Sequence, residues 1–285
     1  MRIAVAVIHG AGTPDKDFAR DTIAAVSQEF ERLTGVKHVD QELIFEPVYW
    51  SEVFAPEQEE LWGRLKESAD LDYTGLRRFV IEFLADAVAY QPAANGKLNY
   101  DKVHAVLAAA LNRLRKKAGP DAPLCVIAHS LGSIVAGNYF YDLQHHPGSR
   151  SANSREDVEM SPLERCHTLS LFYTLGSPMA LWTLRYIDFG LPITIPTPAI
   201  YDYYPSLEGE WVNFYDKDDV LAFPLKAINE AFEEAVTEDI AVNAGGLFTS
   251  WNPLAHLSYD RNKQVAGRIA YGLAKTWRKI NGKVD

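Results

Sequence analysis

Residues 124–133 have the sequence LCVIAHSLGS, and this stretch decides how the chain folds. The apolar run over residues 124–128 predicts a buried strand, and the residues from 134 to about 143 predict a helix. Ser130 stands between them, with Gly132 two residues further on. A strand, a sharp turn, a serine and a helix in this order are typical of a nucleophile elbow, which strains the serine backbone and exposes its hydroxyl. The simpler alternative is that Ser130 only caps the helix.

The composition is that of an acidic globular chain. Of its 285 residues, 47% are hydrophobic and 23% are charged, which is enough for one large core or for a core with a cap. The formal net charge is -10, and the sequence has no basic run and no aromatic–basic stripe. Nucleic acid is therefore not an expected partner.

The N-terminus is apolar, but for too short a span to cross a membrane. It runs directly into His9 and Gly10 without a small-residue cleavage site, so we interpret it as a buried strand and not as a signal peptide. We expect no transmembrane segment and a cytoplasmic location. Cys125 and Cys166 have no metal-type spacing. A disulfide between them is one alternative, and buried thiols in a reducing cytoplasm are the simpler one.

Short apolar runs alternate with amphipathic helical patterns along the chain. This alternation predicts an α/β fold, with a mostly parallel central sheet of about six strands and helices on both faces. The predicted strands span residues 3–8, 42–49, 124–128, 168–175, 211–215 and 239–242. Apolar side chains at spacings of three and four predict helices over residues 23–33, 76–88, 103–114, 225–236 and 265–280. These apolar stripes are expected to face the core.

Three segments interrupt the alternation. Residues 50–100 are too long for one crossover and are expected to hold an inserted region of two helices. Residues 145–165 are polar and lack periodicity, which predicts an exposed loop. Residues 184–207 combine four prolines with many aromatic and aliphatic side chains, and we interpret them as a partial lid. No internal repeat and no linker is visible, so residues 1–285 are expected to form a single domain.

A catalytic serine needs a base within hydrogen-bond reach, and that base needs an orienting carboxylate. On a nucleophile-elbow fold the chain order is serine, acid, histidine. Four histidines follow Ser130, namely His145, His146, His167 and His256. Only His256 comes after the last predicted strand and just before the C-terminal helix, where this fold delivers its base.

The acid is expected in the loop that follows the predicted strand 211–215. Three aspartates compete there, namely Asp216, Asp218 and Asp219. The two that are not the acid are expected to cap a helix or to face solvent, because an aspartate in a loop is usually a turn residue.

The oxyanion of an acyl-transfer reaction needs backbone N–H donors that are already in place. Leu131 follows the serine, and Ala11 lies in the HGAG turn (residues 9–12) after the first strand, so these two residues are the predicted donors. A glycine turn after a strand also fits a phosphate loop. No Lys-Ser/Thr pair follows this turn and the GxGxxG pattern is absent, so no nucleotide is expected. We interpret His9 as a support of the turn.

Together these segments resemble the α/β-hydrolase family, on its lipase and esterase side. The resemblance rests on residues 9–12 (HGAG), 128–132 (AHSLG), 175–178 (LGSP), 218–220 (DDV) and 256–259 (HLSY), which follow the family order over most of the chain. Ala128 stands where glycine is usual, which is a mild departure from the family pattern.

The resemblance implies a role for five residues: Ser130 as nucleophile, Asp218 as acid, His256 as base, and Ala11 and Leu131 as oxyanion donors. Asp218 is preferred to its neighbours because in sequences of this kind the acid often lies two residues before a valine, here Val220. Ser177 is expected to be structural. The family sheet would place strand 42–49 at an edge beside strand 3–8, with the family's first two strands missing. No metal and no cofactor is expected.

The expected function is a serine hydrolase that cleaves a carboxylic ester or related acyl bond in a small-molecule or lipid-like substrate. The same residues would serve a thioesterase, an amidase or an acyltransferase. A catalytically inactive binding or scaffold module of this fold is the rival interpretation. Phe189, Phe248 and Trp251 are predicted to contact an apolar acyl group; alternatively, these aromatic side chains only close the core. The oligomeric state does not follow from the sequence.

Overall fold

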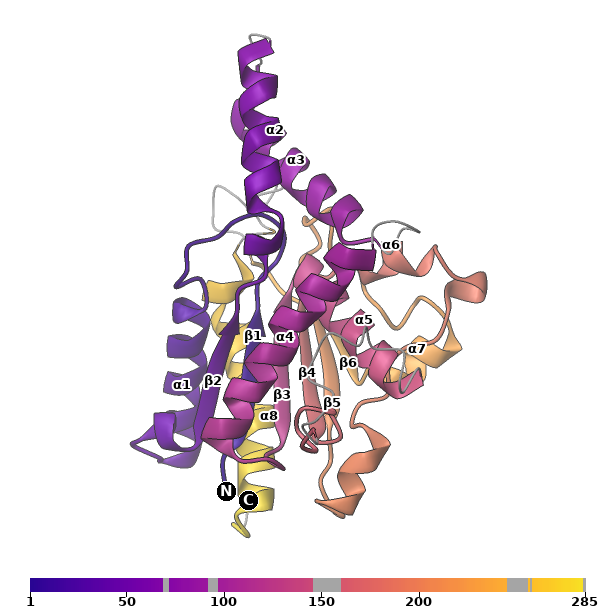
Figure 1. Ribbon diagram of the computed structural model, residues 1–285. Helices are drawn as coiled ribbons and strands as arrows, with labels where there is room; N and C mark the ends of the chain where they lie inside the picture. Colours follow the sequence, from indigo (N-terminus) through magenta and orange to yellow (C-terminus); the bar gives the residue numbers. More distant parts are fainter. Residues whose placement is uncertain (69–71, 92–96, 146–159, 245–255, 257, 284–285) are drawn as a thin grey trace.

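The computed structural model describes residues 1–68, 72–91, 97–145, 160–244, 256 and 258–283. In these residues the chain forms a six-stranded sheet, all parallel, in the order β2-β1-β3-β4-β5-β6 (Figure 1). The strands are β1 (Ile3–Ile8), β2 (Leu43–Val48), β3 (Leu124–His129), β4 (Leu169–Leu175), β5 (Glu210–Tyr215) and β6 (Glu238–Ala241). Every predicted strand is present, so the predicted α/β class is confirmed.

The central strands are buried on both faces. Every residue of β1 and β4 is buried, and β3 is buried up to His129, its last residue. Continuous apolar strands of this kind suit a parallel sheet with helices on both sides. The register sets Ile8 beside Ala128 and His129 beside Leu175, so the carboxyl ends of β1, β3 and β4 meet at one edge of the sheet. The edge strand β2 lies beside β1, as the sequence predicts.

Two helical layers cover the sheet (Figure 1). The odd-numbered side chains of β1 belong to the core that this strand shares with α1 (Arg20–Thr34) and α8 (Lys263–Ile280). The even-numbered side chains belong to the core shared with α4 (Lys97–Ala118) and α5 (Leu131–His145). This division follows from the period of two that points successive strand side chains to opposite faces.

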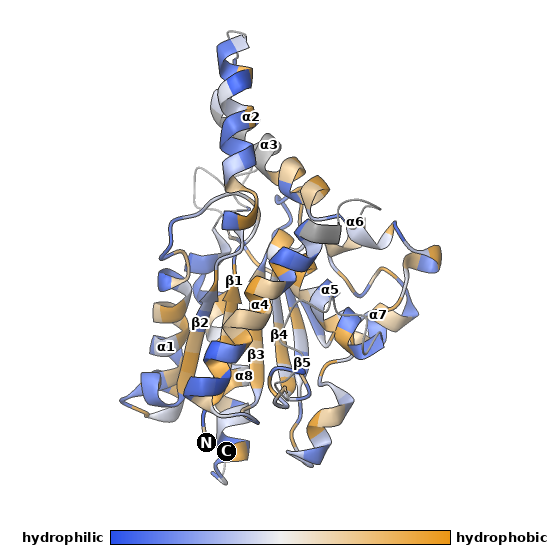
Figure 2. Cartoon of the chain, viewed as in Figure 1, coloured by the Kyte–Doolittle hydropathy of each residue, from blue (hydrophilic) through white to orange (hydrophobic). Residues whose placement is uncertain are grey.

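The inserted region holds the two expected helices, α2 (Ala55–Ser68) and α3 (Thr74–Ala89). They project from the body of the molecule (Figure 1), and α2 is largely hydrophilic (Figure 2). The buried carboxylate of Asp86 fixes the base of this arm, because it accepts hydrogen bonds from the side chain of Gln58 and from the Gly12 N–H. Among the helices that the structure describes, none has the length and apolar character needed to cross a membrane.

One predicted helix is shorter than its apolar pattern suggests. The pattern covers residues 225–236, but α7 spans only Glu230–Ala235. The carboxylate of Asp239 accepts the backbone N–H groups of residues 225 and 226, at 3.0 and 2.8 Å, and holds them in a turn. The Asn229 side chain then caps α7. Local hydrogen bonds from Asp and Asn side chains compete with helix formation in this way.

The segment 184–207 does not form one lid. Its second half packs at the amino ends of the strands, where Tyr204 Oη donates to the carbonyl of Asp121, just before β3, at 2.9 Å. The reason is topological, because a chain that leaves the carboxyl end of β4 must return to the amino end of β5 to run parallel to it. The lid interpretation is therefore corrected for this half. In the first half, residues 185, 186, 189 and 191–193 line one pocket together with residues of α6 (Met179–Thr183).

The two cysteines are free and buried. Cys125 lies in β3, and Cys166 comes shortly before β4. Burial raises the pKa of the Cys125 thiol, so this thiol stays protonated and unreactive. The buried-thiol interpretation therefore holds, and the two residues do not form a disulfide.

Two glycines of α8 form a matched pair that tests how tightly this helix packs on the sheet. A Cβ atom at Gly272 would collide with Tyr173 Oη and Glu210 Oε1, whereas one at Gly267 would meet nothing within 4 Å. We expect Gly267→Ala to raise the free energy of unfolding by about 0.5–1 kcal/mol through helix propensity. Gly272→Ala should lower it by about 1–3 kcal/mol through overpacking. Chemical denaturation measures both shifts, and equal effects at the two positions would contradict the packing described.

Candidate active site

Ser130 occupies the turn between β3 and α5 in a left-handed backbone conformation, with a φ of 51°. This conformation costs a residue other than glycine roughly 1–3 kcal/mol, so its surroundings must hold it. The Ser130 N–H donates to the Leu175 carbonyl at 2.8 Å, and the Ser133 hydroxyl donates to the Ser130 carbonyl at 2.6 Å. A Cβ atom at Gly132 would collide with the carbonyl oxygen of His9, so glycine is required there. The predicted strand–turn–helix geometry is present.

His256 connects Ser130 to a carboxylate. Its Nε2 lies 2.6 Å from Ser130 Oγ, and its Nδ1 lies 2.8 Å from Asp219 Oδ2. All three residues are buried. Because an ionised carboxylate only accepts hydrogen bonds, Nδ1 carries the ring proton and Nε2 accepts the Ser130 O–H. This arrangement allows an imidazole to take a proton from a serine while a carboxylate orients the ring.

The carboxylate in this chain of hydrogen bonds belongs to Asp219 and not to Asp218, the residue predicted as the acid. Asp218 is exposed, and its N–H donates to Asp216 Oδ1 at 3.0 Å. The other oxygen of Asp216 accepts the Ala244 N–H at 2.6 Å, so both oxygens of this buried carboxylate hold the backbone. The Asp219 N–H donates to the Asp216 carbonyl at 3.2 Å, and this turn brings the Asp219 side chain round to His256.

The Asp219 carboxylate is buried and ionised. Burial by itself raises the pKa of this group, but the hydrogen bond and charge of His256, the Leu221 N–H and the Tyr259 hydroxyl outweigh it and lower the pKa. The Leu221 N–H lies 3.0 Å from Oδ1, and Tyr259 Oη lies 2.9 Å from Oδ2. Gly176, with a φ of 58°, makes room for this cluster. A Cβ atom there would lie 2.8 Å from Tyr259 Cε2 and 3.3 Å from both Asp219 Oδ2 and His256 Nδ1.

The turn after β1 lies directly against the serine. A Cβ atom at Gly10 would be 2.7 Å from Ser130 Cβ and 3.4 Å from Ser130 Oγ. Ala11 follows Gly10 in this turn, and Leu131 is the first residue of α5. The amino end of α5 also directs the positive end of its helix dipole toward this place. The oxyanion role of Ala11 and Leu131 stays a prediction.

His9 supports this turn in a neutral state, as interpreted from the sequence. The Trp50 N–H donates to His9 Nε2 at 3.1 Å, so the ring proton is on Nδ1, which donates to the Gly10 carbonyl at 2.7 Å. Burial lowers the pKa of His9 to about 4. The Trp50 indole stacks on the imidazole with 5.0 Å between ring centroids, and its Nε1 donates to the His9 carbonyl at 2.9 Å. Trp50 is thus a support that sequence reasoning did not identify.

His129 and Tyr259 are further residues of the site that sequence reasoning missed. His129 Nε2 lies 2.7 Å from the backbone carbonyl of His256. Burial and the electrostatic interaction with His256 lower the pKa of His129 to about 3, so the neutral ring donates its Nε2 proton to that carbonyl. Tyr259 holds Asp219 in the same way. Both residues stand inside the motifs AHSLG and HLSY, but a motif does not tell in which direction its polar side chains point.

Two of the other histidines that follow Ser130 lie away from the site. His145 ends α5 and His167 comes just before β4, so both are at the amino end of the sheet, opposite to Ser130. His146 lies outside the described residues. Ser177 Oγ accepts the N–H of the first residue of α6 at 3.2 Å, in accord with a structural role.

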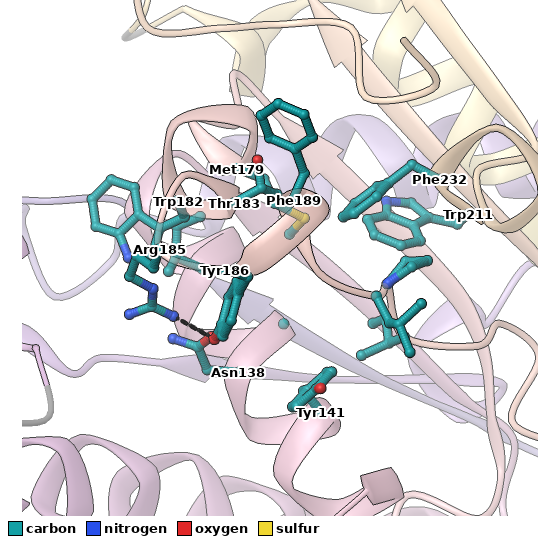
Figure 3. A pocket seen from close by; sticks show the side chains of 15 residues that line it. Asn138, Tyr141, Met179, Trp182, Thr183, Arg185, Tyr186, Phe189, Trp211 and Phe232 are labelled. Atoms are coloured by element: carbon teal, nitrogen blue, oxygen red, sulfur yellow. Dashed lines mark hydrogen bonds between the residues drawn. The ribbon is translucent and has the colours of Figure 1, made fainter. Parts of the chain in front are cut away.

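Of the three residues predicted to contact substrate, the structure describes only Phe189, because Phe248 and Trp251 lie outside the described residues. Phe189 lines a pocket beside α5 (Figure 3). Neither Ser130 nor His256 lines this pocket. The structure does not bring Phe189 to the serine, so its contact with substrate stays a prediction.

No group of three or more histidine, cysteine, aspartate or glutamate side chains that could hold a metal ion occurs in the part of the chain that the structure describes. Comparisons of the chain with protein-family models, with curated proteins and with solved structures found no match. A function is therefore inferred from the geometry of the site.

The lowered pKa of Asp219 makes stability depend on pH. A carboxylate with a lower pKa in the folded state stabilises the fold above its unfolded pKa of about 4, and this contribution is lost as the pH falls through the folded pKa. Between about pH 5 and about pH 2.5 we therefore expect the free energy of unfolding to fall more for the wild type than for Asp219→Asn. Asp218→Asn is the matched control and should follow the wild type. Chemical denaturation across this range measures the slopes, and equal slopes for all three proteins would contradict the prediction.

Proposed function

We propose that this chain is a serine hydrolase of the α/β-hydrolase family that cleaves a carboxylic ester or a related acyl bond. The observation that carries the proposal is the chain of hydrogen bonds from Ser130 Oγ through His256 to Asp219, at 2.6 and 2.8 Å. The left-handed serine at the end of a central parallel strand supports it, because the family places its nucleophile on such a turn. The described sheet has six strands and not the family's full strand order, since the family's first two strands are missing.

In the proposed reaction, His256 Nε2 takes the hydroxyl proton of Ser130 while Oγ attacks the carbonyl carbon of the ester. The N–H groups of Ala11 and Leu131 would donate to the oxyanion that forms. His256 then gives the proton to the leaving alcohol oxygen, and the acyl group stays on Ser130. A water molecule that loses a proton to His256 attacks this acyl group, and the bond to Ser130 Oγ breaks. The carboxylic acid leaves, and His256 returns the proton to Ser130 Oγ. Asp219 keeps Nδ1–H in place and stabilises the imidazolium.

The same chemistry would serve a thioesterase, an amidase or an acyltransferase, which differ in the leaving group or the acceptor. A binding module without catalysis is the rival of another class. Two features disfavour this rival. The left-handed backbone of Ser130 and the buried charge of Asp219 both cost free energy, and a module that only binds has no use for either.

Labelling with a fluorophosphonate tests the proposal, because this reagent phosphonylates an activated serine. We expect one label on Ser130 in the wild type and none in Ser130→Ala. Turnover of a short-chain nitrophenyl ester should fall on the order of 10³-fold or more in Ser130→Ala. Ser68→Ala is the control, because Ser68 is exposed on α2 and should leave label and turnover unchanged. A folded wild-type protein that takes no label on Ser130 would overturn the proposal.

A matched pair of variants tests which aspartate orients His256. Asp219→Asn should lower kcat on the order of 10³-fold to 10⁴-fold, because the amide stabilises the wrong tautomer of the imidazole. Asp218→Asn should leave kcat close to the wild-type value, because this side chain is exposed and its N–H, not its carboxylate, makes the contact with Asp216. Steady-state kinetics on a nitrophenyl ester measures both. An inactive Asp218→Asn beside an active Asp219→Asn would reverse the assignment.

A further inference from the structure

The pocket beside α5 has features that the proposed hydrolysis does not use. It lies between the flank of α5, α6 with the turn that follows it, and the side chains of Trp211 and Phe232 (Figure 3). Its volume is about 540 Å³, including its opening to solvent. None of Ser130, Asp219 and His256 lines it.

One wall of the pocket is a strained turn that is held in place. Asp188 and Phe189 have φ values of 51° and 63°, in the left-handed region that favours glycine, and Gly190 follows with a φ of 70°. Left-handed residues other than glycine are strained. Asn229 Nδ2 donates to the carbonyls of Asp188 and Gly190, at 3.0 and 3.1 Å, and thereby fixes the turn. These hydrogen bonds therefore hold this wall of the pocket in one conformation. Backbone strain of this kind is frequent at functional sites.

The pocket is apolar inside, and its wall presents apolar side chains to solvent. Trp211 and Phe232 are buried and form the inner side. Leu191, which also lines the pocket, is 63% exposed, and Ile187 in the same turn is 90% exposed. Contiguous exposed apolar side chains mark surfaces that bind a partner or ligand. An apolar tail that enters the pocket would cover Leu191.

Hydrogen-bond donors that can accept a further partner lie at the opposite side of the pocket. The guanidinium of Arg185 points toward Asn138 and Tyr186 (Figure 3), and it donates to Tyr186 Oη at 2.9 Å and to Gln91 Oε1 at 2.8 Å. Among the described residues its hydrogen-bond partners are neutral, so its positive charge has no paired carboxylate. The neighbouring Trp182 Nε1 is buried, and no described residue accepts its proton. A buried donor left unpaired costs free energy, which a bound oxygen atom would recover.

We propose that this pocket binds an amphiphilic anion, with its apolar tail against Trp211 and Phe232 and its oxyanion head group at Arg185. The planar fork of a guanidinium matches a carboxylate or a phosphate, and the Trp182 N–H is a further donor on the same side. The net charge of the chain is -10, so the attraction for an anion is local to Arg185. The proposal goes beyond hydrolysis, because binding here requires no reaction at the serine.

Tryptophan fluorescence reports on binding, because Trp182 and Trp211 line the pocket. We would titrate the Ser130→Ala chain, in which turnover cannot intervene, with decanoate, decyl phosphate and 1-decanol below their micellar concentrations. At least one of the two anions should bind saturably and about tenfold or more tighter than the alcohol, as a charge-assisted hydrogen bond implies. The tighter of the two anions identifies the head group. Equal binding of anion and alcohol, or no saturable change, would overturn the proposal whether or not Ser130 is catalytic.

Variants at Arg185 test its role in the same titration. Arg185→Gln keeps an N–H donor but removes the charge, and should weaken binding of the anion by about tenfold. Arg185→Lys restores the charge and should recover part of the affinity. Arg64→Gln is the matched control, because Arg64 is exposed on α2 and pairs with Glu60. Unchanged affinity in a folded Arg185→Gln protein, or an equal loss in Arg64→Gln, would overturn the assignment of the head group to Arg185.

Discussion

The close approach between the serine turn and the end of β1 is the constraint on which the rest of the structure depends. Ser130 has a left-handed backbone, and the carbonyl of His9 occupies the space that a side chain at position 132 would need. Because β1 and β3 are neighbours in a parallel sheet, the turns that follow them leave the sheet at the same edge. Only glycine at positions 10 and 132 lets these two turns touch. The turn of residues 9–12, which contains the proposed oxyanion donor Ala11, is thereby held against the serine. The proposed reaction needs a donor that is preorganised in this way.

Burial separates the roles of the titratable groups around this contact. His9 and His129 have pKa values lowered to about 4 and about 3, and each neutral ring donates to a backbone carbonyl. Neither ring therefore competes as a base. The pKa of Asp219 is lowered in spite of burial, so a negative charge stands at Nδ1 of His256. Of these three imidazoles, only that of His256 contacts both Ser130 Oγ and a carboxylate.

Most of the fold could be predicted because it depends on local patterns. Apolar runs without alternation predicted the parallel strands. The glycine turn and Ser130 each follow a predicted strand, and His256 precedes the predicted C-terminal helix. The contact of Asp219, and not Asp218, with His256 could not be predicted, because it depends on contacts between distant parts of the chain. Asp219 is selected by Tyr259, 40 residues away, and by the turn that Asp216 holds. The return of residues 198–207 to the amino end of the sheet was not predicted. Their apolar and aromatic composition indicates that they pack on the protein, but not on which end of the sheet.

The inserted helices hold the turn beside the serine and the pocket at the same time. Asp86, in α3, accepts the N–H of Gly12, next to the predicted oxyanion donor Ala11. Gln91, two residues beyond the end of α3, accepts from the Arg185 guanidinium in the pocket wall. The helix α5 makes the second connection, because the serine turn leads into its first residue and its later turns line the pocket. A displacement of α3 relative to the sheet would therefore strain both the turn beside the serine and the pocket wall. The inserted helices thus connect these two parts of the structure by hydrogen bonds.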